Sequence, residues 1–229
     1  MIPEEEPILI TPAMLAGETL GSGPGGARID FERGMRMAPP LILVLILANI
    51  AMFAWEIAAG ALSDGESIIA AGALVQDRVF AGEVWRLISA TFLHGGFDHL
   101  LGNCLVLYIV GIACEHGLGF VQTAAVYFAS ALGGSLLSVA LRPGPSVGAS
   151  GAVFGVAAAV VVFLYRHQDR FELRDKRVGV VLAIWAAYQV VIGFSSPLID
   201  NFAHIGGLLG GAAAAWGMRP RLLPGPTPG

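Results

Sequence analysis

The chain has 229 residues, of which 55% are hydrophobic and only 13% charged, and its mean hydropathy is +0.72. An average soluble domain carries about 25% charged residues, so this composition excludes an ordinary soluble protein and indicates an integral membrane protein. No basic patch with interleaved aromatic residues accompanies the net charge of −4, so we expect no nucleic-acid partner.

Residues 1–38 are acidic and then rich in glycine and proline, which predicts a disordered N-terminal tail. Residues 62–96 form a long connection with amphipathic pieces, a length typical of functional or interfacial loops. We predict an all-α, six-helix polytopic membrane domain over 39–218, followed by a short C-terminal tail over 219–229. Its apolar stretches, several of them shorter than the 20 or so residues of a full span, lie at 39–61, 97–115, 119–141, 150–165, 178–194 and 202–218.

Basic residues are unevenly distributed between the two sides of this predicted bundle. Ten of the 13 lie in the N-terminal flank, in the connection after the fourth stretch, or at the C-terminus. Only Arg78, Arg86 and Arg142 lie on the other side. The positive-inside rule therefore places both termini in the cytoplasm. Heavy use of arginine, alanine and glycine is typical of a GC-rich bacterial genome, so we expect a bacterial inner-membrane protein.

Three polar residues are predicted to lie at one depth of the membrane: Ser150, His204 and His99. Each precedes, by 15 or 16 residues, a charged residue that marks the cytoplasmic end of its stretch, namely Arg166, Arg219 and Glu115. At about 1.5 Å per helical residue, each polar side chain lies roughly 22–24 Å above that end, within a hydrocarbon core about 30 Å thick. Polar groups inside a membrane are costly and usually functional, so this layer is predicted to be a site.

Ser150 and His204 are a candidate nucleophile and base. A serine hydroxyl is a weak nucleophile until a base takes its proton, and His204 is the only histidine at this depth on a helix that could face the fourth stretch. Glycines at four-residue spacing permit close helix packing, which would bring the imidazole within hydrogen-bonding reach. Gly148 also precedes the serine where the backbone must bend and a substrate must come close. The spaced glycines are Gly151 and Gly155 in the fourth stretch, and Gly206, Gly207, Gly210 and Gly211 in the sixth.

An acyl-transfer site also needs hydrogen-bond donors for the developing oxyanion, each worth about 2.7–4 kcal/mol. Asn103 lies one helical turn below His99 on the same helix face, so both side chains are candidate donors. The N–H of Ser150 is a third candidate, because the first amides of a helix have no partner within it.

Five short segments occur in a fixed order along these stretches: Trp85-Arg86, His99-x3-Asn103, Gly111-Ile112-Ala113-Cys114-Glu115, Gly148-Ala149-Ser150-Gly151 and Ala203-His204-Ile205-Gly206-Gly207. Together they resemble the motifs of the rhomboid intramembrane serine proteases. The resemblance covers roughly residues 39–218, the predicted six-helix domain, and the two tails lie outside it.

The resemblance implies a serine endopeptidase with a Ser150–His204 catalytic dyad, and with oxyanion stabilisation by His99, Asn103 and the Ser150 N–H. It implies substrates that are transmembrane segments of other proteins in the lipid bilayer, cut near the outer face at small residues. One position departs from some relatives, which have a tyrosine where Phe154 stands. The phenyl ring can still stack on the catalytic histidine, but the hydroxyl is missing.

The other ionisable residues near the helices receive structural interpretations. Asp200 lies four residues before His204, and we interpret it as a helix N-cap rather than as the third member of a triad. The remaining residues are expected to be structural (His94), to reach lipid headgroups (Glu56), to pair with a loop cation (Glu115) or to be solvated (His116 and His167). The chain has no His-Glu-x-x-His motif, and we expect no metal ion and no cofactor.

Two other functions are compatible with six apolar stretches. A catalytically silent relative would bind transmembrane segments without cutting them, although the serine, the histidine and the glycines argue against it. A small transporter or channel is expected to show inverted repeats with paired broken helices, and the sequence has no such internal symmetry.

Overall fold

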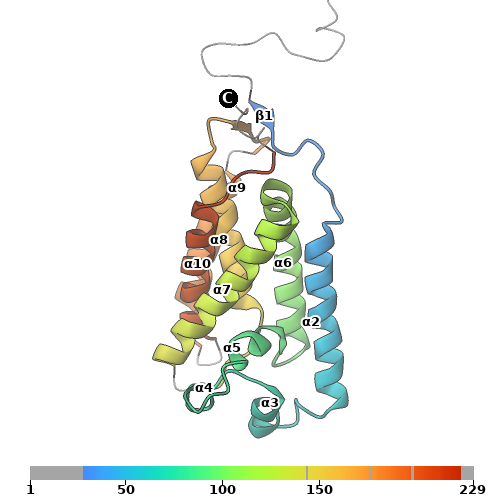
Figure 1. Cartoon of the computed structure of the whole chain (residues 1–229), viewed down its shortest axis with the longest axis vertical. Helices are drawn as coiled ribbons and strands as arrows, with labels where there is room; N and C mark the ends of the chain where they lie inside the picture. The colour runs from blue at the N-terminus through green and yellow to red at the C-terminus, as the bar shows by residue number, and fades with distance from the viewer. Residues whose placement is uncertain (1–27, 143, 176, 197–198, 223–229) are drawn as a thin grey trace, which may run out of the picture.

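The computed structural model describes residues 28–142, 144–175, 177–196 and 199–222. Its main body is a bundle of six helices, which match the six predicted apolar stretches to within a few residues, so the all-α prediction is confirmed (Figure 1). The helices are α2 (Pro40–Ala58), α6 (Phe97–Leu118), α7 (Phe120–Leu141), α8 (Ser150–Arg166), α9 (Val178–Gly193) and α10 (Asn201–Trp216).

The six helices fall into two groups by length. Within the described residues, α2, α6 and α7 have 19, 22 and 22 residues and are long and apolar enough to cross a membrane. The other three, α8, α9 and α10, have only 17, 16 and 16 residues. A helix rises about 1.5 Å per residue, so these three helices are shorter than a hydrocarbon core of about 30 Å.

The connection between α2 and α6 is folded rather than loose. It contains α3 (Gly65–Ala71), α4 (Gln76–Phe80), α5 (Arg86–Ser89) and a 3-10 turn at Ala90–Phe92, all at the end of the bundle opposite β1 (Figure 1). Arg86 is only 4% exposed, and it donates hydrogen bonds to the carbonyl oxygens of Ile69 and Ala73. Its hydrogen bond to the Glu83 carboxylate lowers the pKa of that carboxyl. Arg86 therefore holds three parts of this connection together.

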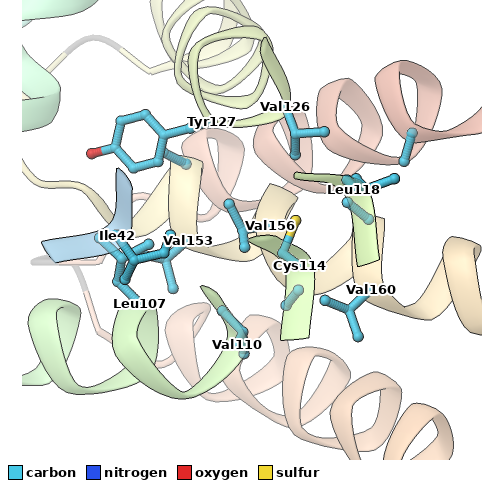
Figure 2. Packing of buried hydrophobic residues seen from close by; sticks show 14 of the residues in the cluster. Ile42, Leu107, Val110, Cys114, Leu118, Val126, Tyr127, Val153, Val156 and Val160 are labelled. Carbon is cyan, nitrogen blue, oxygen red and sulfur yellow. The ribbon is translucent and has the colours of Figure 1, made fainter. Parts of the chain in front are cut away.

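Helix α8 is the centre of the bundle. Twelve of its 17 residues are buried, and it contacts α6, α7, α9 and α10. Figure 2 shows Val153, Val156 and Val160 of α8 among Ile42 and Leu107 from α2 and α6. Lipid tails are as apolar as these side chains, so close van der Waals packing holds the helices together. Helix α9 lies at the edge, because only two of its residues are buried.

The segment before α2 corrects the predicted tail. Residues 1–27 lie outside the described part, but the described residues 28–38 are ordered. Strand β1 (Ile29–Asp30) pairs in parallel with β2 (Phe171–Glu172), and Phe31 is 3% exposed in the core. The prediction failed here because Ile29 and Phe31, two apolar residues among charged ones, form too short a pattern to indicate a strand or a buried segment. At the other tail, Arg221 donates to the carbonyl oxygen of His116.

Two charged or titratable residues at the end of α6 are also corrected. The Glu115 carboxylate, predicted to pair with a loop cation, instead accepts the backbone N–H groups of Leu41 and Ile42 at 3.2 and 3.1 Å, in the first turn of α2. His116, predicted to be solvated, is 6% exposed, and its Nε2 lies 2.7 Å from the carbonyl oxygen of Phe31. Both side chains therefore bond to backbone groups of the segment that leads from β1 into α2.

Replacing Glu115 with alanine is expected to lower the free energy of unfolding by about 1–3 kcal/mol, because two buried amides of α2 lose their acceptor. The measurement is thermal or denaturant unfolding in detergent micelles. Glu66→Ala is the matched control, since Glu66 lies exposed in the first turn of α3. Equal stability of the two variants would contradict the capping role of Glu115.

Candidate active site

Ser150 and His204 meet where α8 and α10 begin. Ser150 is the first residue of α8, and His204 lies in the first turn of α10. The Ser150 Oγ lies 3.0 Å from the His204 Nε2, which is hydrogen-bonding distance. The imidazole is only 8% exposed, whereas the serine is half-buried. The structure therefore brings these two side chains together as the spacing predicted.

Backbone contact between the two helices sets this distance. A Cβ added to Gly207 of α10 would overlap the carbonyl oxygen of Gly151, and one added to Gly211 would overlap that of Gly155. The sequence predicted this seam between the fourth and sixth helices. It did not predict that the neighbouring pair of α10 glycines faces another helix, α7. There a Cβ added to Gly210 would lie 2.8 Å from the carbonyl oxygen of Ala129.

Aromatic rings fix the plane of the imidazole. The Phe154 ring lies one helical turn after Ser150 and stacks on His204, with ring centroids 4.2 Å apart and planes at 9°. Trp185 of α9 lies behind Phe154, with centroids 5.2 Å apart. The stacking that we expected from a phenyl ring at this position is therefore present. Trp185 was missed, because a single tryptophan in an apolar helix gives no signal of what it packs against.

Both the backbone conformation at position 148 and the lack of space around it require glycine. Its φ of +123° lies in a region that L side chains rarely adopt, and its N–H donates to the carbonyl oxygen of Ala90 at 2.8 Å. An added Cβ would lie 2.6 Å from the His99 Cε1 and 3.5 Å from the Asn103 Nδ2. The turn before Ser150 therefore brings its backbone against the side chains of α6.

Asn103 and His204 each have a buried side-chain nitrogen without a hydrogen-bond partner among the described residues. These nitrogens are the Asn103 Nδ2, on a residue 8% exposed, and the His204 Nδ1. A buried donor without a partner costs about 1–3 kcal/mol, so such groups are rare unless a ligand or water meets them. The N–H of Ser150 is available as well, because it starts α8.

A cavity of about 550 Å³ joins these groups. Its lining includes all four predicted side chains, Ser150, His204, His99 and Asn103, together with residues from the connection before α8 and from α9. This volume lies in the range of small-ligand sites, about 300–1,000 Å³. The Ser150 hydroxyl is therefore on the wall of a cavity large enough to admit a small molecule or water.

Asp200 caps α10, as predicted. It is the N-cap residue, and its carboxylate accepts the N–H of Ala203 at 3.0 Å. Its second oxygen accepts the hydroxyl of Ser138 at 2.5 Å, and its first lies 3.9 Å from a nitrogen of Arg142. The Ser138 contact was not predicted, because the two residues are 62 positions apart and nothing local connects them.

Glu56 and His94 do not line the cavity but lie next to His99, which does. Glu56 was predicted to reach lipid headgroups, but it is fully buried and accepts the backbone N–H of His94 at 3.0 Å. The His94 ring packs against the His99 ring, with centroids 5.2 Å apart. The headgroup interpretation of Glu56 was wrong, because the sequence does not show that the connection between α2 and α6 folds back onto this residue.

Comparison with known proteins identifies the fold. A rhomboid domain matches residues 81–221. The chain belongs to the rhomboid family. It is 36% identical over 182 residues to rhomboid protease GluP of Bacillus subtilis (strain 168), covering 79% of this chain and 35% of GluP. It is 33% identical over 199 residues to rhomboid protease AarA of Providencia stuartii, covering 75% of this chain and 70% of AarA.

The chain is also similar to plant proteins. RHOMBOID-like protein 5 of Arabidopsis thaliana is 40% identical over 143 residues, which cover 61% of this chain and 46% of that protein. This rhomboid therefore spans about a third to a half of the length of GluP and of the Arabidopsis protein. It is an integral membrane protein of the rhomboid protease family.

Gly207→Val is expected to lower the stability of this rhomboid by about 1–3 kcal/mol, because the new side chain can be accommodated only by moving α10 away from α8. The measurement is the unfolding midpoint of the purified protein in micelles. Gly217→Val is the matched control, since a Cβ there meets nothing within 4 Å. If both variants unfold like the wild type, the glycine seam does not set the helix separation.

Proposed function

We propose that this rhomboid is an intramembrane serine endopeptidase that cleaves transmembrane segments by a Ser150–His204 dyad. The observation that carries the proposal is the 3.0 Å contact between the serine Oγ and the imidazole Nε2 at the wall of the cavity. Membership of the protease family and the named proteases among its relatives support it.

The proposed reaction is acyl transfer in two steps. The His204 Nε2 takes the proton of Ser150 as its Oγ attacks the scissile carbonyl carbon, and the carbonyl oxygen becomes an oxyanion. The histidine then gives this proton to the leaving amine as the C–N bond breaks. Water enters the cavity, loses a proton to His204 and hydrolyses the acyl-enzyme, which restores the serine hydroxyl.

We assign oxyanion stabilisation to His99, Asn103 and the N–H of Ser150. The two side chains line the same cavity as the nucleophile, and the Asn103 Nδ2 has no partner among the described residues. Gly148 lets the backbone before Ser150 pass beside His99. Phe154 orients the imidazole, while Gly151 and Gly207 hold the two helices close enough for proton transfer. No residue in this scheme needs a cofactor or a metal ion.

The proposed substrates are transmembrane proteins in the lipid bilayer. Trp185, Gln189 and Ile192 of α9 line the cavity, and α9 is the most weakly buried helix of the bundle. A hydrophobic segment that reaches the serine from the bilayer would therefore displace little packing. The short span of α8 supports cleavage near one membrane face rather than at its centre, and we propose the outer face from the distribution of basic residues.

The same distribution supports both termini in the cytoplasm and a bacterial inner membrane. We propose that residues 39–218 form the protease domain, preceded by a cytoplasmic tail over 1–38 that includes the strand β1, and followed by a short tail over 219–229.

A small fluorophosphonate is expected to label Ser150 in the wild type, because only an activated serine attacks phosphorus at a useful rate. Labelling is expected to disappear in His204→Ala. Mass spectrometry of the modified peptide identifies the residue. His167→Ala is the matched control, since this half-buried histidine bonds to the carbonyl oxygen of Phe163 far from the cavity, and it should label normally. Equal labelling of His204→Ala would remove His204 as the base.

Asn103→Ala is expected to lower kcat about 10²- to 10³-fold on a transmembrane substrate in liposomes, with little change in KM, because an oxyanion donor acts in the transition state. Asn49→Ala is the control, since Asn49 is a buried asparagine of α2 whose side chain donates to the carbonyl oxygen of Leu45. That variant should lose stability and keep its kcat. A wild-type protein that binds such substrates and never cleaves them would instead indicate a silent binding protein.

A further inference from the structure

The carboxylate of Asp200 joins the first turn of α10 to the last turn of α7. The residue is 9% exposed, and it accepts hydrogen bonds from the N–H of Ala203 on α10 and from the hydroxyl of Ser138 on α7. A guanidinium nitrogen of Arg142, the C-cap residue of α7, lies 3.9 Å away. Both carboxylate oxygens are therefore engaged.

These contacts stabilise a buried negative charge. The N-terminus of a helix carries partial positive charge, and the α10 amides point at the carboxylate. The hydroxyl of Ser138 and the positive charge of Arg142 stabilise the same carboxylate further. A buried carboxylate with such partners is costly to disturb, because removal of one partner leaves the others unsatisfied.

The position of Ala203 makes this arrangement relevant to the dyad. Its carbonyl oxygen is packed between two helices: a Cβ added to Gly134 of α7 would lie 2.7 Å from it, and one added to Gly151 of α8 would lie 2.9 Å from it. A shift of the first turn of α10 toward α7 or α8 would therefore press this carbonyl against the backbone of Gly134 or of Gly151, the residue after Ser150. Asp200 caps this turn, and His204 lies in it.

Arg142 extends the connection to the nucleophile. It begins the segment that leads from α7 to Ser150, and it lines the same cavity as the dyad. Asp200 thus ties the start of the helix that carries the base to the start of the segment that carries the nucleophile. Its carboxylate contacts Ala203, Ser138 and Arg142 and forms no hydrogen bond to the His204 imidazole among the described residues.

We propose that Asp200 is a positioning residue of this protease: its carboxylate fixes the first turn of α10 against the end of α7 and thereby holds His204 at hydrogen-bonding distance from Ser150. The inference rests on the proposed function. It differs from a catalytic triad, because the Asp200 carboxylate forms no hydrogen bond to the imidazole and instead bonds to the backbone of α10 and to Ser138.

The test compares kcat and KM of Asp200→Ala, Asp200→Asn and Ser138→Ala on a transmembrane substrate in liposomes. A misplacement of about 1 Å costs up to roughly 100-fold in rate, so Asp200→Ala should lower kcat about 10- to 100-fold and leave KM within about twofold. Asparagine caps a helix as well as aspartate does but lacks the charge, so Asp200→Asn should lie between alanine and wild type. Ser138→Ala, which keeps the cap intact, should lower kcat in the same direction.

The matched control is Asp64→Ala, which removes an equivalent N-cap, the acceptor of the Ser67 N–H in α3, far from the dyad. It should leave kcat unchanged. A cap with only a structural role predicts wild-type kcat in Asp200→Asn and in Ser138→Ala, and that result would overturn the proposal even if Asp200→Ala does not fold. A wild-type protein without cleavage activity would instead contradict the proposed function itself.

Asp200→Ala already removes the acceptor of the Ser138 hydroxyl, so the effects of Asp200→Ala and Ser138→Ala on kcat should not add in the double variant. The double variant should fall no further than Asp200→Ala alone. Full additivity of the two effects would show that Ser138 and Asp200 act separately and would contradict the network.

Discussion

The structure depends on one close contact: the backbones of α8 and α10 touch at glycines, and this contact holds the Ser150 hydroxyl against the His204 imidazole. In a membrane, apolar side chains gain little by leaving lipid for a protein interior, so helices associate through van der Waals contact and a few polar bonds. Glycine permits the closest approach. Larger residues in the seam would separate the helices by more than a hydrogen bond can span.

The rest of the molecule supplies what this contact needs in a bilayer. The polar side chains require water and hydrogen-bond partners that lipid does not provide. Helix α8 is shorter than a full span, the folded connection between α2 and α6 lies at one end of the bundle, and the cavity of about 550 Å³ is lined by residues of α6, α8, α9 and α10. Buried carboxylates at Glu115 and Asp200 satisfy helix N-termini where water has little access.

Helix positions, the glycine seam and the shared depth of Ser150 and His204 could be predicted, because each follows from spacing along one helix. Contacts between distant segments could not. Nothing local indicates that Phe31 packs in the core, that Glu56 bonds to the backbone of His94, or that Ser138 reaches Asp200. An ionisable residue at a predicted membrane end was therefore interpreted as solvated or interfacial, whereas tertiary packing buries it against backbone amides and carbonyls.

The most direct test of the central claim is the structure of the phosphonylated protein in lipid nanodiscs, determined after reaction with a small fluorophosphonate. The account predicts a bond from phosphorus to the Ser150 Oγ, the His204 imidazole beside it, and the phosphonyl oxygen directed at Asn103 and His99. An adduct on another residue, or an imidazole separated from the serine by an intervening helix, would contradict it.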